Sequence, residues 1–290
     1  SLIISRNKIK SENLCLFKTE YDALDKVLDL FVPKYQEAVT HFPCWPYLYL
    51  STKEKKITMK YILLKEEELS IQPNLKKIKG SLTTKTKLIY LSSPNTVTGQ
   101  QLETSDFEEI MKDIPDNIII LIDQRFYDFS SKNNFDPIKY INRYNILILR
   151  SFNNFYGIEN LEMAYLIGNS ELIEFIKDTQ IIDPIDNFND QLAVVAYNDN
   201  VHNSNIRKRV ETEKNKMINM FIKNNIKYFP SDTSYLLVET PQKRDEVSSF
   251  LKKENIILYE SNDTYNGYWT LPISDSETNS KVLDVLMMNS

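Results

Sequence analysis

The sequence predicts an α/β fold with a large domain, built on a mostly parallel sheet with helices on both faces, and a smaller C-terminal α+β domain. Residues 117–122 and 145–149 are almost entirely apolar, as strands covered on both faces of a parallel sheet must be. Such strands alternate along the chain with segments of helical periodicity, which is typical of a doubly wound domain. After about residue 224 this alternation gives way to a different pattern. We therefore place the large domain at residues 1–200 and the small one at residues 201–290.

The elements of the large domain are predicted in order from their apolar spacing. Residues 22–30 and 107–114 have helical periodicity, and Ser105 with Glu108 is typical of a capping box at the start of the second helix. A further helix is expected from residue 170 to about residue 177. The short apolar strands of this domain are expected at residues 37–40, 87–91, 117–122, 145–149 and 164–167.

The small domain is predicted to begin with a long amphipathic helix over residues 204–224. Strands and helices then follow, which indicates a compact α+β unit packed beside the large domain. These are a strand at residues 235–238, a helix at 243–253, strands at 256–259 and 268–271, and a final helix from residue 276.

Composition excludes several classes of function. The formal charge of -5 and the pI of about 5.3 argue against nucleic acid or an anionic membrane as a partner, because neither is attracted to a net-negative surface. No apolar run approaches the roughly 20 residues that span a bilayer. Two cysteines, Cys15 and Cys44, without a secretory leader predict a cytoplasmic protein with two free, buried thiols, although the sequence also allows one disulfide between them.

No metal site is predicted. His41 and His202 are isolated and have no further ligands at a recognisable spacing, so we expect them to be structural or exposed. The pair Asp183 and Asp186 is expected to lie in a loop and not to form an acid/base pair.

Three stretches, in one order, carry a resemblance to a known family. They are LSSPNTVTGQ at residues 91–100, ILIDQRFYDF at residues 120–129 and LRSFNNFYGIENL at residues 149–161. Together they resemble the S-P-N-N-P-T-G, V-D-E-A-Y and R-T-x-S-K-A-Y-G-L-A-G motifs of pyridoxal-phosphate-dependent class I and II aminotransferases. The closest match is the histidinol-phosphate aminotransferase group. Each stretch alone is a weak signal, whereas the ordered trio at fitting separations is specific.

The resemblance extends over nearly the whole chain. Residues 12–22 resemble the family's E-N-I strand and its G-N-G-S-D-E segment, and residues 42–47 resemble P-T-Y-P-x-Y. Residues 233–238 resemble the strand that opens the small domain. The resemblance implies a fold-type-I aminotransferase whose N-terminal arm and first helices are missing. Either the chain is trimmed, or it is one module of a longer polypeptide.

The chemistry of that family sets four requirements. Pyridoxal phosphate needs a lysine whose neutral amine links to it covalently and then moves the substrate's α-proton. An acidic residue pairs with the pyridinium nitrogen. Hydroxyl groups and glycine N–H groups at a helix N-terminus hold the phosphate, and a late arginine clamps the substrate carboxylate.

Carried over residue by residue, the resemblance implies that the covalent link and the phosphate contacts are lost. Asn154 takes the place of the lysine, and no lysine lies between Lys139 and Lys177 to replace it. The family's phosphate-binding Gly-Ser becomes Thr19–Glu20, and its phosphate-binding arginine becomes Glu162. Two carboxylates there would repel a phosphate dianion.

The ring and substrate contacts also change. Thr96 and Phe126 replace an asparagine and a tyrosine that face the ring hydroxyl, and the substrate-binding arginine falls at or beside Trp269. Asp123, in the place of the pyridinium partner, and Trp45, in the place of the stacking aromatic, are retained, although a strand-end cap and a core aromatic are the favoured explanations of these two residues. The resemblance thus implies no catalytic residue and a vestigial cofactor cleft formed by Trp45, Thr96, Asp123, Phe126, Ser151, Asn154, Glu162 and Thr19.

Three hypotheses for function follow. The first is a degenerate histidinol-phosphate-aminotransferase-like protein that is inactive as a transaminase, binds no cofactor and acts through protein contacts, as a homodimer or as a heterodimer with a relative. The second is an enzyme that binds pyridoxal phosphate or pyridoxamine phosphate non-covalently. The third is an aminotransferase-like module fused to a nucleotidyltransferase.

Overall fold

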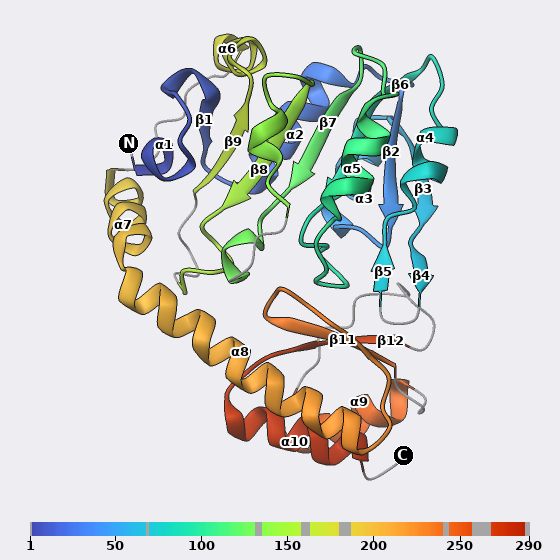
Figure 1. Ribbon diagram of the computed structural model, residues 1–290, viewed down its shortest axis with the longest axis vertical. Coiled ribbons are helices and arrows are strands. Elements are labelled where there is room, and N and C mark those ends of the chain that lie inside the picture. Colours follow the sequence, from blue (N-terminus) through green and yellow to red (C-terminus); the bar gives the residue numbers. More distant parts are fainter. Residues whose placement is uncertain are drawn as a thin grey trace.

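The chain forms two lobes, each built around one sheet (Figure 1). The computed structural model describes residues 2–67, 70–130, 135–157, 163–179, 187–239, 244–256 and 268–287. Within these residues a seven-stranded sheet forms the larger lobe and a three-stranded sheet the smaller one, and a two-stranded hairpin, β4 (Lys65–Glu67) and β5 (Ser70–Gln72), extends from the larger lobe.

The large sheet has the order β1-β9-β8-β7-β6-β2-β3. Neighbouring strands from β8 to β3 are parallel, and β9 is antiparallel to both of its neighbours. The prediction of a mostly parallel sheet is therefore confirmed. The strands are β1 (Leu14–Phe17), β2 (Glu37–Phe42), β3 (Thr58–Leu63), β6 (Thr86–Ser92), β7 (Ile119–Asp123), β8 (Ile146–Ser151) and β9 (Ala164–Gly168).

Helices cover both faces of this sheet, as predicted, because successive side chains of the buried strands point to opposite faces. In β7, Ile120 packs on one face and Leu121 on the other. The first face is covered by α1 (Leu2–Asn7), α4 (Leu75–Gly80), α5 (Thr104–Met111) and α7 (Asn187–Asn198). The second face is covered by α2 (Glu20–Phe31), α3 (Pro46–Glu54) and α6 (Ser170–Thr179).

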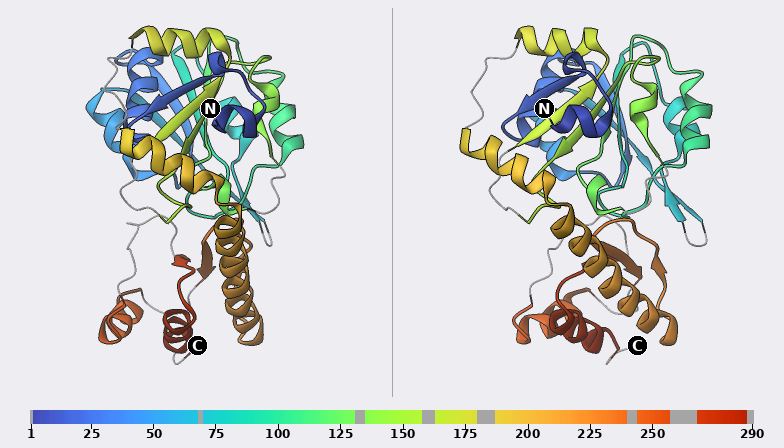
Figure 2. Two further views of the ribbon diagram at one scale, coloured as in Figure 1. Left: turned by 90° about the vertical axis from the view of Figure 1, so that its left-hand side faces the viewer. Right: turned by 60° about the vertical axis from the view of Figure 1, so that its left-hand side comes forward.

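The smaller lobe is joined to the larger one by α8 (Asn200–Lys223), a helix of 24 residues that runs from one lobe to the other (Figures 1 and 2). Its antiparallel sheet has the order β10-β11-β12. The elements are β10 (Tyr228–Phe229), β11 (Tyr235–Glu239), α9 (Arg244–Lys253), β12 (Tyr268–Pro272) and α10 (Ser276–Met287). The expected strand at 256–259 lies outside the described residues beyond Ile256, and the division at residues 200 and 201 stays a prediction.

Two parts of the chain differ from expectation. Helix α5 begins at Thr104 with Glu103 at the N-cap, so Ser105 lies in the first turn and the predicted capping box is wrong. No helix or strand was expected between the Pro-rich turn at residues 42–46 and residue 80, yet the described residues of this stretch form α3, β3, the β4–β5 hairpin and α4. β3 lies at the edge of the sheet, where it is half-exposed, and Thr58 and Lys60 interrupt the apolar residues of its first half, unlike the apolar run of a central strand.

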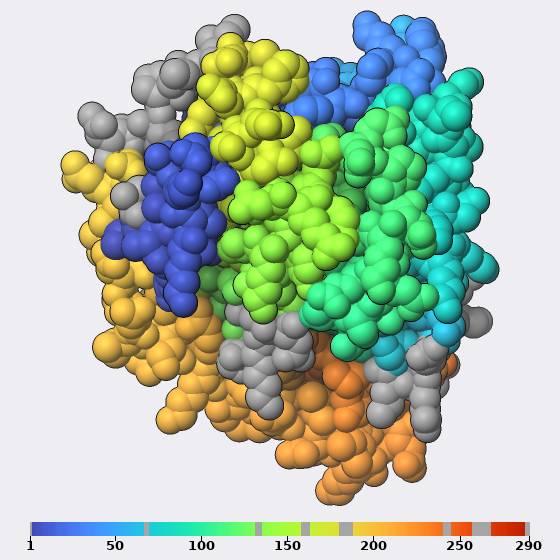
Figure 3. All heavy atoms as spheres, turned by 45° about the horizontal axis from the view of Figure 1, so that its top comes forward, coloured from blue at the N-terminus to red at the C-terminus, as the bar shows by residue number. Residues whose placement is uncertain are grey.

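The surface and the buried thiols complete the description. Figure 3 shows the first residues of the chain beside α6 on one face of the larger lobe, where the 3-10 helix η1 (Ser11–Asn13) contacts α6. Cys15 and Cys44 are buried and free. Within the described ranges, no helix is both long enough and apolar enough to cross a membrane.

Candidate functional site at the carboxyl ends of the parallel strands

Three parallel strands end at one edge of the large sheet, on the side of the smaller lobe (Figure 1). β6 ends at Ser92, β7 at Asp123 and β8 at Ser151, and Ser92 lies directly opposite Asp123 in the sheet register. In open α/β sheets this edge is where ligands bind. The sequence-predicted residues Asp123 and Ser151 are brought together here.

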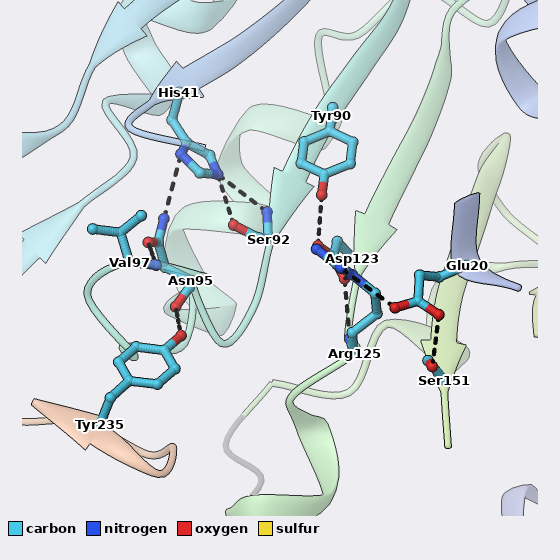
Figure 4. Close-up of polar contacts among 10 residues, drawn as sticks. All are labelled: Glu20, His41, Tyr90, Ser92, Asn95, Val97, Asp123, Arg125, Ser151 and Tyr235. Atoms are coloured by element: carbon cyan, nitrogen blue, oxygen red, sulfur yellow. Dashed lines mark hydrogen bonds and ion pairs between the residues drawn. The ribbon is translucent and has the colours of Figure 1, made fainter. Parts of the chain in front are cut away.

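Asp123 is held in a buried ion pair with Arg125 (Figure 4). Its Oδ1 accepts from Nε of Arg125 at 2.9 Å, and its Oδ2 accepts from Nη2 of Arg125 at 2.9 Å. The Tyr90 hydroxyl also donates to Oδ2, at 2.5 Å, and the Arg125 backbone N–H donates to Oδ1. Two parallel charge-assisted hydrogen bonds make this a bidentate arginine–carboxylate ion pair, which is stronger than a hydrogen bond between neutral groups.

The charges of this pair support one another. Burial by itself lowers the pKa of Arg125, but Asp123, Tyr90 and Glu20 together outweigh burial and hold that pKa above its usual value. Burial, and then Asp123, raise the pKa of Tyr90 well above its usual value, so the phenol stays protonated and donates. The result is a fixed guanidinium at the edge of the sheet.

Trp45 lies against this guanidinium. The Arg125 Cζ atom is 3.5 Å from the centre of the Trp45 ring, a close cation–π contact. Trp45 precedes α3, at the end of the Pro-rich turn, and its ring packs against Tyr21 and Tyr47, each at a centroid distance of 5.3 Å. The two residues that sequence analysis retained, Asp123 and Trp45, therefore lie on either side of one arginine side chain.

Glu20 begins α2 and points into the same site (Figure 4). Its buried Oε2 accepts from Asn153 Nδ2 at 2.6 Å and from Ser151 Oγ at 3.2 Å, and its Oε1 is 3.9 Å from Arg125 Nη1. Thr19 acts as the N-cap of α2, because its Oγ1 accepts from the backbone N–H of Asp22. A carboxylate therefore lies at the helix N-terminus, where an anion is favoured.

Some buried side-chain atoms in the segments that follow β6 and β8 have no hydrogen-bond partner among the described residues. Three of them are Asn154 Nδ2, Asn153 Oδ1 and Thr96 Oγ1. Buried polar groups normally have partners, so these atoms are candidates for hydrogen bonds with water or a ligand. Asn154 and Thr96 are both residues that sequence analysis assigned to the cleft.

Other predicted residues lie elsewhere. Phe126 packs edge-on against Tyr235 at 5.5 Å, and the Tyr235 hydroxyl donates to the Asn95 carbonyl at 2.7 Å, so this pair bridges the two lobes. Trp269 is buried in the core of the smaller lobe. Glu162 lies outside the described residues, as do Asp183 and Asp186.

His41 is a structural residue of this edge. Its buried ring bonds the Pro43 carbonyl through Nδ1 at 2.8 Å and accepts from the Ser92 backbone N–H through Nε2 at 3.2 Å. Burial lowers its pKa to about 4, so the ring is neutral near pH 7. His202 is exposed on α8.

Arg125 is the residue that sequence analysis missed. It occupies the alanine position of the V-D-E-A-Y motif, two residues after Asp123. A large cation in the place of a methyl group, beside a carboxylate at a strand end, was the signal that marks it.

The family model described as aminotransferase class I and II matches residues 5–266. Among curated proteins, histidinol-phosphate aminotransferase of Brevibacillus brevis is 26% identical over 73% of this chain and 59% of its own length. Histidinol-phosphate aminotransferase 2 of Haemophilus influenzae (strain Rd) is 25% identical over 61% of this chain and 49% of its own length. The chain thus spans about half the length of the curated relatives it matches.

Solved structures agree in fold. Histidinol-phosphate aminotransferase of Clostridium acetobutylicum superposes with a TM-score of 0.88 at 18% identity, over 99% of this chain and 86% of that one. The Sinorhizobium meliloti protein of the same name, solved in complex with pyridoxal-5'-phosphate, gives 0.87 at 12% identity, over 99% and 80%. Identities this low show a shared fold alone.

These findings contradict the expectation that no cofactor is bound, since the matched family and the Sinorhizobium meliloti complex point to pyridoxal phosphate. The expectation was wrong because the loss of single contacts, such as the covalent link at Asn154, does not by itself prevent non-covalent binding of a cofactor. The side chains of this structure nevertheless do not fit the cofactor's ring as they lie. A ring stacked on Trp45 and paired with Asp123 would occupy the space of the Arg125 guanidinium, so Arg125 must move before a ring can enter.

Proposed function

This chain belongs to the aminotransferase class I and II family, and from that premise we propose that it is a histidinol-phosphate-aminotransferase-like protein that does not transaminate and acts through protein contacts. Asn154 carries the proposal. It follows β8 by three residues, and its side-chain nitrogen is buried at the candidate site. An amide nitrogen shares its lone pair with the carbonyl, so it neither attacks an aldehyde nor accepts a proton near pH 7.

A labelling experiment tests the loss of the covalent link. We expect that incubation with pyridoxal phosphate, reduction with borohydride and mass spectrometry will find no stoichiometric label in the full chain. Exposed lysines are expected to react only partially, and an active histidinol-phosphate aminotransferase treated in parallel supplies the positive control. One full equivalent of label on a single lysine, together with amino-group transfer from glutamate, would overturn the proposal.

The proposed protein contact is an association with a second copy of this chain. Supporting it, exposed aromatic and aliphatic side chains lie on the packed helices α2 and α3, which begin at the candidate site: Tyr21, Tyr49 and Leu50. Aromatic residues are enriched in interfaces, and exposed apolar side chains of adjacent elements are typical of a buried contact.

A charge placed on this surface tests the association. Leu50→Glu is expected to shift the mass measured by light scattering from dimer towards monomer, because a buried interface does not accept an unpaired carboxylate. Ile222→Glu is the matched control, since Ile222 is 59% exposed on α8 in the smaller lobe and Leu50 is 57% exposed. A monomeric wild-type chain, or equal dissociation by both variants, would contradict the proposal.

A second candidate function is non-covalent binding of pyridoxal phosphate or pyridoxamine phosphate in the same cleft. The placement of Trp45 and Asp123 on either side of one planar cation favours it. The three buried polar atoms without partners among the described residues favour it too. Thermal denaturation with and without pyridoxamine phosphate tests this candidate, and an unchanged midpoint at saturating ligand would count against it.

A further inference from the structure

The side chain of Arg125 is held as an aromatic cationic ring would be held. A guanidinium is flat and delocalised, and here it lies on the Trp45 ring at 3.5 Å. Its nitrogens donate to the Asp123 carboxylate at 2.9 Å. Stacking on an aromatic residue combined with an N–H bond to a carboxylate is also what a protonated pyridine ring requires of its site.

The side chain of Glu20 is held as a phosphate would be held. Its carboxylate lies at the N-terminus of the 12-residue helix α2, where the helix dipole favours an anion. It accepts from Ser151 Oγ and Asn153 Nδ2, two neutral donors at the end of β8. Both donors are more than 130 residues away in sequence, so this contact is made by the fold and not by local structure.

The two side chains reproduce the charge pattern of one ligand. The Arg125 cation and the Glu20 anion approach within 3.9 Å, and both are buried. Pyridoxal phosphate and pyridoxamine phosphate likewise join a flat ring, cationic when its nitrogen is protonated, to an anionic group. The partners of both residues also match the positions that the sequence motifs assign to the cofactor cleft: Trp45, Asp123 and Ser151.

We propose that Arg125 and Glu20 are an internal occupant of the cofactor cleft, which competes with a pyridoxal-type phosphate for the same contacts. An external ligand binds only to the fraction of molecules in which Arg125 has left Trp45 and Asp123. The observed dissociation constant is then the intrinsic constant divided by that fraction. Substitutions that remove the occupant therefore tighten binding, although they remove a cation from the site.

Binding of pyridoxamine phosphate tests the competition, because this probe has no aldehyde and forms no adduct with surface lysines. By equilibrium dialysis of the full chain, Arg125→Ala is expected to bind it about tenfold or more tightly than wild type. The matched control is Arg6→Ala, since Arg6 also lies over an aromatic ring, that of Tyr197 at 4.4 Å, but bonds the Tyr197 carbonyl and not a residue of the cleft. Equal or weaker binding by Arg125→Ala would overturn the proposal.

Arg125→Lys guards against failure of the alanine variant to fold. A lysine keeps the positive charge beside Asp123 but supplies no flat group to cover Trp45. It is expected to bind pyridoxamine phosphate more tightly than wild type. An affinity equal to that of wild type would also overturn the proposal.

Chemical rescue with free guanidinium tests whether Arg125→Ala leaves a vacant guanidinium site or only a less stable protein. Guanidinium chloride at low millimolar concentration is expected to raise the melting temperature of Arg125→Ala and to compete with pyridoxamine phosphate for that variant. It should do neither for Arg6→Ala. The same response in both variants would contradict occupation of the cleft. These measurements do not involve Asn154, so their failure leaves the proposal on transamination standing.

Glu20→Ser tests the anionic part of the proposed internal occupant, which is the Glu20 carboxylate. Replacing the carboxylate with a hydroxyl removes the negative charge at the start of α2 and leaves a donor for a phosphate oxygen. Inorganic phosphate is the probe, and we expect tighter binding than to wild type, with Arg125→Ala showing a smaller gain. Unchanged phosphate binding by Glu20→Ser would show that Glu20 is not part of the internal occupant.

Discussion

Asp123→Ala is expected to lower the free energy of unfolding by about 3–5 kcal/mol, because it leaves the Arg125 guanidinium buried without its partner. Arg125 has no equally close replacement within the described residues, since Glu20 lies 3.9 Å away and already accepts from Ser151 and Asn153. Urea denaturation followed by circular dichroism measures the change. Urea is preferred because guanidinium itself resembles the side chain under study.

Asp29→Ala is the control for this result. Asp29 also forms an ion pair, with Lys55 at 2.7 Å, but its side chain is 59% exposed, so its loss is expected to cost less than about 1 kcal/mol. Similar costs for the two variants would contradict the prediction. The double substitution Asp123→Leu with Arg125→Met removes both buried charges, and we expect it to be more stable than Asp123→Ala alone.

The fold was predictable because its central strands are distinctive. In β7 and β8 nearly every residue is apolar, since helices cover both faces, and this pattern located them within two residues. β3 was not predicted because it lies at the sheet edge, where exposed positions admit polar residues. Helix α3 was missed because it begins at Pro46, the last residue of the Pro-rich segment 42–46, where prolines indicate a turn as readily as the start of a helix.

The candidate site was predictable in position but not in its contacts. Motif order located Asp123, Ser151 and Asn154 at strand ends, and parallel strands bring such ends together. The orientation of the long Arg125 side chain depends on Trp45, 80 residues earlier, and no local pattern encodes that contact. Glu20 was expected only to repel phosphate, because its partners Ser151 and Asn153 are far away in sequence.

The second large effect is expected at Gly99, the glycine of the S-P-N-N-P-T-G motif. Gly99→Ala is expected to cost about 2–5 kcal/mol, the sum of a left-handed backbone at about 1–2 kcal/mol and overpacking at about 1–3 kcal/mol. Gly99 has φ +72°, and an added Cβ would overlap Ser231 Oγ and lie 2.8 Å from Thr233 Oγ1. The two lobes meet at this point.

The neighbours of Gly99 cannot easily move away. Ser231 Oγ bonds Thr233 Oγ1 at 2.9 Å and accepts from the Thr233 backbone N–H at 3.1 Å, so rotating it breaks two contacts. The Asp232 backbone N–H donates to the Gly99 carbonyl at 2.8 Å, which fixes the separation of the two backbone segments. The added methyl group therefore has to force the loop after β6 away from the segment before β11.

Gly157→Ala is the control that separates the overpacking cost of Gly99→Ala from its backbone cost. Gly157 has nearly the same backbone conformation, φ +68°, but no atom of the described residues lies within 4 Å of an added Cβ. Its cost is therefore expected to be the backbone strain alone, about 1–2 kcal/mol. Urea denaturation of both variants gives the difference, which measures how tightly the smaller lobe is held against the strand ends that carry the cleft. Equal costs would show that the loop yields to the methyl group and that the contact between the lobes is soft.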